Sequence, residues 1–224
     1  MTDTFSLSPH PTYRLIPSRF PPIGLFDTVA TASDLPAVLD LAGWTSDRLV
    51  GHRLKRLPQS DWAFGRPNTS IVMASFLHVA PGGMRFNGPE LGAWYAAAAE
   101  RTGIVEVAHH LRREAFATGL PSLSRKYRVY TATLDGSYMD IRGQQANLPT
   151  VYDPLNYAGS QALGESVRQS GENGIIYDSL RHAGGTNTVV HRPNSIVDIM
   201  QTKHFDIKVL VGSLRVEVSL LVLP

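Results

Sequence analysis

The chain has 224 residues, of which 43% are apolar and 18% are charged, and its formal net charge is only +2. These values exclude an intrinsically disordered chain and allow one large domain with a substantial core. The absence of cysteine excludes a disulfide framework, a thiolate nucleophile and a zinc site with cysteine ligands.

Charge and hydropathy also bear on partners and location. The basic residues are too sparse to be typical of a nucleic-acid-binding protein, so we expect no direct contact with nucleic acid. The densest basic cluster consists of Arg48, Arg53, Lys55 and Arg56, and it indicates a solvated face or a face that meets an acidic partner. The most apolar stretch, residues 216–223, is too short to cross a bilayer. Because the N-terminus also lacks the features of a signal peptide, we expect a cytoplasmic protein.

The first predicted elements are a short strand at residues 13–16 and a helix over residues 35–43. Ser33 and Asp34 are suitable N-cap residues for this helix, and Gly43 is a suitable stop signal. The first third of the chain therefore holds little predicted secondary structure.

The middle of the chain is less regular. Residues 70–79 are rich in β-branched and aromatic residues without a clear period, which predicts a buried strand. Over residues 94–117, local propensity favours one long helix. However, Thr102 is a plausible N-cap, and apolar residues follow helical spacing after it. We therefore predict a short strand that ends near Tyr95, followed by a helix over residues 102–117.

The rest of the chain alternates in the manner of strands, with one further helix. Asp135 and Gly136 form a turn signal between two of these strands. Ser160 is expected to cap the helix, which Gly171 terminates. The strands are expected at residues 127–133, 137–141, 174–179, 188–191, 207–211 and 214–222. This pattern predicts a β-rich α+β fold, with mixed or antiparallel sheets flanked by helices in a single domain over residues 1–224.

Four residues from two separate stretches suit one kind of chemistry: Arg85, Tyr95, Glu106 and Ser179. The arginine fork donates two parallel hydrogen bonds to phosphate oxygens, and tyrosine offers a flat face to a pyridinium or purine ring. A carboxylate stabilises the oxocarbenium-like carbon that forms when an N-glycosidic bond breaks. Nicotinamide leaves NAD⁺ from a nitrogen that is already cationic, so no second carboxyl group is needed as an acid. A single glutamate therefore suits NAD⁺ cleavage better than sugar hydrolysis.

Each of these residues also has an ordinary structural explanation when it is taken alone. A lone arginine or glutamate usually lies on the surface, a strand tyrosine in the core, and a serine beside an aspartate in a turn. Competing motifs do not fit the chain. Ser179 lacks the G-x-S-x-G setting of a hydrolase nucleophile. The adjacent His109 and His110 diverge on a helix, so we expect no metal site.

The chain resembles the RES-domain family, the toxin halves of bacterial toxin-antitoxin pairs whose antitoxins carry an Xre-type helix-turn-helix. The first block of family residues stands here as GGMRFNGPE, AWYAAAAE and TGIVEV, which contain Arg85, Tyr95 and Glu106. The later block stands as GIIYDSLRHAGGTN, which contains Ser179 and Arg181. Two separated blocks therefore agree with the family in the same order.

The resemblance is best over residues 70–195, and residues 1–69 are divergent. Within the first block Met84 is inserted before Arg85, and Gly103 stands where the family usually has alanine. A glycine at a helix start loosens the helix by roughly 1 kcal/mol. None of these departures removes a functional group.

The resemblance implies a fold similar to that of ADP-ribosyltransferases and an enzyme that consumes NAD⁺ as its substrate without a metal. In this interpretation Arg85 grips the pyrophosphate, and Tyr95 packs on the nicotinamide or its ribose. Glu106 supports the transition state. Ser179 either donates a hydrogen bond to the substrate or holds Glu106 in place.

Two further residues and several partners follow from the same resemblance. Asn87 and Arg181 are candidates for substrate binding, although a structural ion pair would explain Arg181 equally well. The expected partners are NAD⁺ and a cognate Xre-type antitoxin. Alternatively, the ADP-ribosyl group passes to a metabolic enzyme of the cell. A hypothesis from another class is a non-catalytic module that binds a nucleotide or a partner protein.

Overall fold

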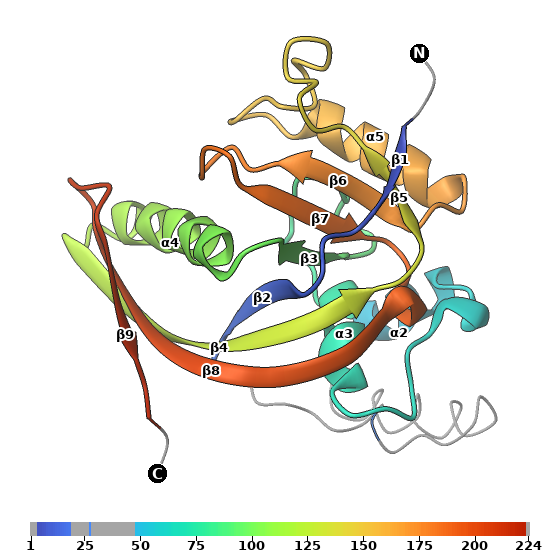
Figure 1. Cartoon of the computed structure of the whole chain (residues 1–224), viewed down its shortest axis with the longest axis horizontal. Helices are drawn as coiled ribbons and strands as arrows, with labels where there is room; N and C mark the ends of the chain where they lie inside the picture. Colours follow the sequence, from blue (N-terminus) through green and yellow to red (C-terminus); the bar gives the residue numbers. More distant parts are fainter. Residues whose placement is uncertain (1–3, 19–26, 28–47, 223–224) are drawn as a thin grey trace.

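The computed structural model describes residues 4–18, 27 and 48–222, which form one nine-stranded sheet with helices packed against it (Figure 1). The strands are β1 (Phe5–Leu7), β2 (Thr12–Pro17), β3 (Trp94–Ala97), β4 (Ser122–Leu134), β5 (Ser137–Asp140), β6 (Gly174–Asp178), β7 (Thr186–Val190), β8 (Ile196–Leu210) and β9 (Val216–Leu220). The α-helices are α2 (Arg48–Arg56), α3 (Thr69–Leu77), α4 (Glu100–Ala117) and α5 (Ala158–Gln169), and two 3₁₀ turns are η2 (Gln59–Asp61) and η3 (Pro193–Ser195).

The strand order in the sheet is β1-β5-β6-β7-β3-β2-β4-β8-β9. Among the described residues every neighbouring pair is antiparallel except β5 and β6. The predicted α+β class is therefore confirmed, as one large and mostly antiparallel sheet flanked by helices. None of the helices in the described ranges combines the length and the apolar character that crossing a bilayer requires.

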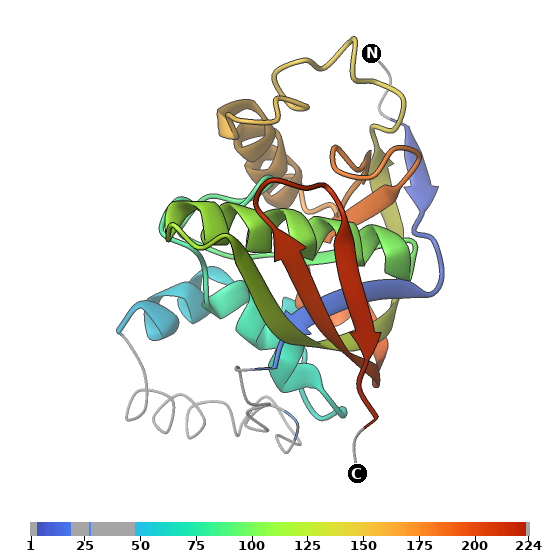
Figure 2. The same cartoon turned by 90° about the vertical axis from the view of Figure 1, so that its left-hand side faces the viewer.

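The sheet is strongly curved along its two longest strands. The register of β4 and β8 shifts between Arg128 and Tyr130 and again between Thr131 and Thr133. Such irregularities bend a strand and increase its local twist. Helix α4 lies on the concave side of this curve, against β2, β4 and β8 (Figures 1 and 2). The curve therefore places α4 beside the central strands β2 and β3.

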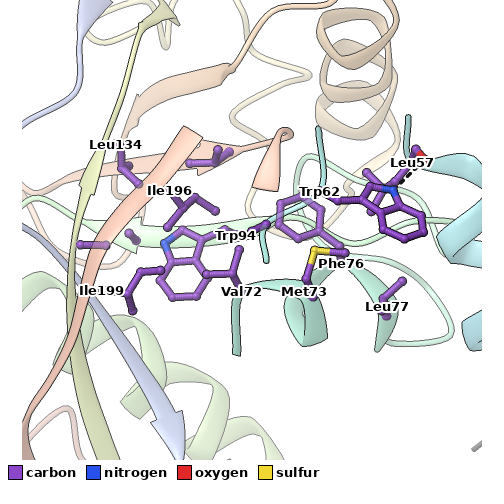
Figure 3. Packing of buried hydrophobic residues seen from close by; sticks show 14 of the residues in the cluster. Leu57, Trp62, Val72, Met73, Phe76, Leu77, Trp94, Leu134, Ile196 and Ile199 are labelled. Atoms are coloured by element: carbon purple, nitrogen blue, oxygen red, sulfur yellow. Dashed lines mark hydrogen bonds between the residues drawn. The ribbon is translucent and has the colours of Figure 1, made fainter. Parts of the chain in front are cut away.

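The largest buried cluster lies where α3 meets the centre of the sheet. Trp94 on β3 is fully buried and packs with Val72 and Phe76 of α3 and with Ile196 and Ile199 of β8 (Figure 3). A second cluster involves α5, and a third lies between α4 and the β4–β8 pair. The helices are therefore held on the sheet by three separate apolar contacts.

The strand predicted over residues 70–79 is wrong, because this segment forms α3. Val72, Met73 and Phe76 are completely buried and Leu77 is only 3% exposed. A helix that is covered on most of its sides has no polar face, so its sequence shows no helical period. The apolar run that suggested a strand is thus the core-facing surface of a buried helix.

The prediction for residues 94–117 is confirmed as a strand followed by a helix. The helix begins two residues earlier than predicted, because Ala99 occupies the N-cap position and Thr102 lies inside α4. Thr102 is 1% exposed, and its Oγ1 hydrogen-bonds His182 Nδ1 at 2.9 Å. The hydroxyl that suggested a cap therefore joins α4 to the loop after β6.

The other predicted elements within the described residues are present, with three changes. The strand expected at residues 207–211 is only the end of β8, which begins at Ile196. The strands on either side of Asp135 and Gly136 exist, but they do not pair with each other: β4 pairs with β2 and β8, and β5 with β1 and β6. Ser160 lies inside α5, and Tyr157 is its N-cap residue. The helix predicted over residues 35–43 falls outside the described residues.

Candidate active site

Most of the residues singled out from the sequence line one cavity of about 360 Å³. It is bordered by α4, by β2 and β3, and by the loops before β3 and after β6. The predicted residues that line it are Arg85, Asn87, Tyr95, Glu106 and Arg181. Ser179 does not line the cavity but contacts Glu106. The fold thus joins two sequence blocks that are about seventy residues apart around one space.

Glu106 lies on α4 and is anchored through one of its two oxygens. Oε1 accepts hydrogen bonds from Ser179 Oγ at 2.6 Å and from Asn187 Nδ2 at 2.7 Å. Oε2 has no hydrogen-bond partner among the described residues. Short bonds of this kind to a carboxylate are charge-assisted and fix its orientation. The carboxylate is therefore held in place while one oxygen stays available to a ligand.

Ser179 is fully engaged in this anchor. Its Oγ accepts hydrogen bonds from the backbone N–H groups of Arg181, at 3.1 Å, and His182, at 3.0 Å, and donates to Glu106. A hydroxyl has one donor and two acceptor positions, and all three are used here. Ser179 is 8% exposed. The geometry therefore favours a positioning role for Ser179 over contact with a ligand.

The loop that carries Ser179 is closed on itself and tied to α4. The backbone N–H of Ser179 donates to Gly185 O at 2.8 Å, and Gly185 N–H donates to His182 O at 2.9 Å. A side chain at Gly185 would approach His182 and Thr102 to 2.9 Å. The bond between Thr102 and His182 adds a tether to the first turn of α4. The carboxylate and its anchor are thereby held on one rigid unit.

Arg85 also lines the cavity and lies on the loop before β3. Its Nη1 donates to the backbone oxygens of Val151, at 3.2 Å, and Asp153, at 2.9 Å. Its guanidinium carbon lies 4.6 Å from the centre of the Tyr157 ring. Nε and Nη2 of Arg85 have no hydrogen-bond partner among the described residues. Because a guanidinium carries five N–H donors, several remain for an anionic ligand.

The turn that presents Arg85 is built tightly against α5. Met84 and Asn87 exchange backbone hydrogen bonds, at 2.9 and 3.5 Å, across the turn. The left-handed Gly83 leaves no room for a side chain, since a Cβ would lie 2.2 Å from Asn87 O. On α5, a Cβ at Gly164 would lie 2.0 Å from the backbone oxygen of Phe86. Met84, inserted relative to the family pattern, is therefore part of a defined turn.

Tyr95 braces the same turn through its hydroxyl group. The hydroxyl accepts from Phe86 N–H at 2.9 Å and donates to Asn87 Oδ1 at 2.8 Å. Burial raises the pKa of Tyr95 far above its ordinary value. The Asn87 amide nitrogen donates to the backbone oxygens of Gly88 and Leu91. The polar atoms of Tyr95 and Asn87 are thus used within the protein, and the Tyr95 ring is left to face the cavity.

Two further guanidinium groups line the cavity. Arg14 of β2 donates to Tyr95 O at 3.2 Å and lies 4.5 Å from the centre of the Trp94 ring, while its Nε has no partner among the described residues. Burial lowers the pKa of Arg14 to about 10, so it remains charged at neutral pH. Arg181 donates to Pro154 O at 3.0 Å and forms no ion pair in the described part of the chain.

The charges around the cavity are unequal. Its lining contains Arg14, Arg85 and Arg181 but a single carboxylate, Glu106. Such a site attracts a ligand with more than one negative charge. The described residues contain no group of three histidine, aspartate or glutamate side chains arranged as metal ligands. The arrangement therefore suits an anionic organic ligand with one electron-poor centre near Glu106.

The sequence alone assigned no role in the site to three residues, Arg14, Tyr157 and Asn187, although Tyr13 and Arg14 resemble the start of the family pattern. Arg14 and Tyr157 come from β2 and from the start of α5, far from both sequence blocks. Asn187 is the last residue of the later block, GIIYDSLRHAGGTN, and its position there was the available signal. Its role depends on β7 lying close to α4, which only the folded chain reveals.

Comparisons with known proteins agree with the two sequence blocks. A family model described as RES domain matches residues 53–209, a range that contains both blocks. The chain belongs to the RES-domain family. The predicted membership is thereby confirmed, and the matched range extends on both sides of the segment that resembled the family best.

Two individual proteins are similar to this RES-domain chain. The uncharacterized protein y4oC of Sinorhizobium fredii (strain NBRC 101917 / NGR234) is 26% identical over 196 residues, which cover 86% of this chain and 80% of that protein. A chain in the crystal structure of the M. tuberculosis MbcT-MbcA toxin-antitoxin complex is 15% identical, with a TM-score of 0.48. That match covers 90% of this chain and 86% of the other.

Proposed function

We propose that this chain cleaves NAD⁺ at the bond between nicotinamide and ribose, and that it is the toxin of a toxin-antitoxin pair. The observation that carries the proposal is a carboxylate, fixed through one oxygen, in the same cavity as three guanidinium groups. A dinucleotide offers a diphosphate to the arginines and an anomeric carbon to the carboxylate. The cavity volume lies within the range of about 300–1,000 Å³ typical of ligand sites.

The chemical step follows from the position of Glu106. The bond between the anomeric carbon and the pyridinium nitrogen breaks, and its electron pair stays with the nitrogen, so nicotinamide leaves as a neutral molecule. The ribose carbon becomes an oxocarbenium-like cation, which Oε2 of Glu106 stabilises by its negative charge. Water then adds to this carbon and loses a proton, and the product is ADP-ribose. Phosphate attack would instead yield the phosphorylated product.

The surrounding residues divide into those that contact NAD⁺ and those that position other groups. Arg85 is proposed to bind the diphosphate through its free donors, with Arg14 and Arg181 as additional cations. The ring of Tyr95 is proposed to pack on the nicotinamide or its ribose. Ser179 and Asn187 hold Glu106, and Asn87 helps to hold the turn of Arg85.

The proposed biological role rests on family membership. RES domains are known as the toxin halves of pairs with an Xre-type antitoxin, and we propose such a partner for this chain. Expression of the wild-type chain alone should then arrest growth, while Glu106→Gln should not. Co-expression of the cognate antitoxin should restore growth.

Incubation of the purified protein with NAD⁺ tests the proposed activity. Release of nicotinamide over many turnovers, with equal formation of ADP-ribose or its phosphorylated form, supports cleavage. Labelling of a cellular protein by radioactive NAD⁺ would instead favour ADP-ribosyl transfer. Binding of ADP-ribose in calorimetry without any loss of NAD⁺ would contradict both and favour a non-catalytic binding module.

A further inference from the structure

The two edges of the sheet differ in how they are protected. The edge strand β1 has only three residues, and short edge strands resist pairing with other chains. The opposite edge strand, β9, is longer and pairs only with β8 among the described residues (Figure 1). It contains neither lysine nor proline, the residues that commonly block an edge. Among the described residues, β9 is therefore the longer and less protected of the two edges.

The backbone groups on this less protected edge belong to the apolar residues of β9. Leu221 N–H donates to His204 O at 2.8 Å, and the register of β8 and β9 has no irregularity. Because hydrogen-bonding direction alternates along an antiparallel strand, Glu217 and Ser219 also face β8. The N–H and C=O groups of Val216, Val218 and Leu220 consequently point away from the sheet.

The side chains of the same three residues form an apolar row, in which Val216 is partly buried and Val218 and Leu220 are exposed. Val216, Val218 and Leu220 lie opposite Val209, Ile207 and Phe205 of β8, respectively, and these three are buried beside α4. Val218 is 40% exposed and Leu220 is 60% exposed. On the other face Glu217 pairs with Lys208 at 3.6 Å. The apolar core of the sheet thus continues onto β9, where Val218 and Leu220 stay exposed in the described part of the chain.

We propose that two copies of this chain associate through β9, which pairs with itself in antiparallel orientation about Val218. In this register Val218 faces Val218 of the second copy, and Val216 faces Leu220. All three outward-facing residues then meet as hydrogen-bonded pairs, which gives roughly six backbone hydrogen bonds, two for each facing pair.

Charge supports the same register. Glu217 faces Ser219 of the second copy, so no like charges meet. If the two strands paired about Glu217 instead of Val218, the two Glu217 carboxylates would lie opposite each other, which is unfavourable. The pairing also sets the more exposed Leu220 beside Val216 of the second copy, which packs against the cluster under α4. Backbone direction, side-chain face and charge are therefore all compatible with this arrangement.

The proposed dimer is independent of the proposed activity, because none of the described residues that line the cavity belongs to β9. Failure of the dimer would therefore leave the NAD⁺ proposal intact, and failure of NAD⁺ cleavage would leave the dimer intact.

Single cysteines test the register directly, because the chain has none of its own. Facing residues of a hydrogen-bonded pair have Cα atoms about 5.5 Å apart, within the range of about 4.4–6.8 Å that a disulfide needs. Val218→Cys should therefore form a covalent dimer on mild oxidation. In the matched control Ser219→Cys, the two cysteines lie diagonally across the interface, with residues roughly 7–8 Å apart. This variant should therefore cross-link at least about tenfold more slowly.

Sedimentation of variants without cysteine completes the test. The wild type should sediment as a dimer, and Val218→Lys, which sets two positive charges opposite each other, as a monomer that still unfolds in one cooperative transition. Ser219→Lys on the polar face should remain dimeric. A monomeric wild type, a dimeric Val218→Lys, or equal cross-linking of the two cysteine variants would overturn the proposal. If Val218→Lys fails to fold, the cross-linking rates decide.

Discussion

The two sides of the cavity hold their charged groups by different means. Glu106 is oriented by two side chains, Ser179 and Asn187, which both donate to the same oxygen. Arg85 is oriented by the backbone oxygens of residues 151 and 153 and by the ring of Tyr157. A backbone carbonyl is present whatever the side chain, whereas a hydroxyl or amide donor is lost in a single substitution.

The two kinds of anchor predict different effects of substitution. The orientation of the carboxylate can be changed without disturbing the fold, while the position of the guanidinium depends on how the loop is packed. Substitutions on the Glu106 side should therefore alter the rate of the chemical step. Those on the Arg85 side should alter binding or stability.

The largest effect is expected for Glu106→Gln, which keeps the shape of the side chain and removes its charge. Loss of one electrostatic stabiliser typically lowers turnover by roughly 100- to 1000-fold. Nicotinamide release measures this directly. Glu100→Gln is the matched control on the same helix, since Glu100 pairs with Lys203 at 2.9 Å outside the cavity. Wild-type turnover in Glu106→Gln would remove this residue from the chemistry.

A smaller effect is expected when the anchors of the carboxylate are removed. Ser179→Ala and Asn187→Ala each delete one hydrogen bond to a charged group, which corresponds to roughly a tenfold loss or more. Because the anchors orient Glu106, kcat should fall while KM changes little. Asn194→Ala is a suitable control, since Asn194 binds the backbone of Ser60 away from the cavity. A rise in KM at constant kcat would instead indicate direct contact with the substrate.

On the other side, Arg85→Lys should act mainly on binding. Lysine keeps the charge but loses the planar fork and its packing on the Tyr157 ring. We expect KM for NAD⁺ to rise by roughly tenfold with a smaller change in kcat. Tyr157→Phe keeps the ring and should behave as the wild type. An unchanged KM in Arg85→Lys would show that the diphosphate is held elsewhere.

The smallest effect lies outside both sides of the cavity, at His191. This side chain is 1% exposed, neither ring nitrogen has a partner among the described residues, and burial together with Arg168 lowers its pKa well below the ordinary value. The unfolded chain therefore binds a proton near pH 6.5 that the folded chain does not. Stability should fall as pH decreases below 6.5, by at most about 1.4 kcal/mol per pH unit from this group.

Urea unfolding of the wild type and of His191→Leu at neutral and acidic pH measures this contribution. The variant should lose less stability than the wild type on acidification. An equal loss in both proteins would show that His191 does not cause the pH dependence.

The sequence predicted most elements correctly where their pattern is local. The strands and α4 follow alternation or helical spacing, and the fold class followed from them. It failed at α3, since a buried helix lacks the polar face that reveals its period. The sequence also could not show that the strands on either side of Asp135 and Gly136 lie in different parts of the sheet, because strand pairing depends on residues far apart in the chain.

The residues of the site likewise divide into those that the sequence predicted and those that only contacts between distant segments reveal. The resemblance of two sequence blocks to the RES-domain family pointed to Arg85, Tyr95 and Glu106, which line one cavity. The contacts of Tyr157 and Asn187 arise only when α5 and β7 fold against the two blocks. Likewise, the choice between the two roles considered for Ser179 needed the positions of its three hydrogen-bond partners.

The most direct test of the central claim is a crystal structure of the Glu106→Gln variant with NAD⁺ bound. The diphosphate should lie on the free nitrogens of Arg85, and the anomeric carbon of the nicotinamide ribose should lie against the side chain of residue 106. A dinucleotide bound outside this cavity, or bound with its diphosphate away from Arg85, would contradict this claim.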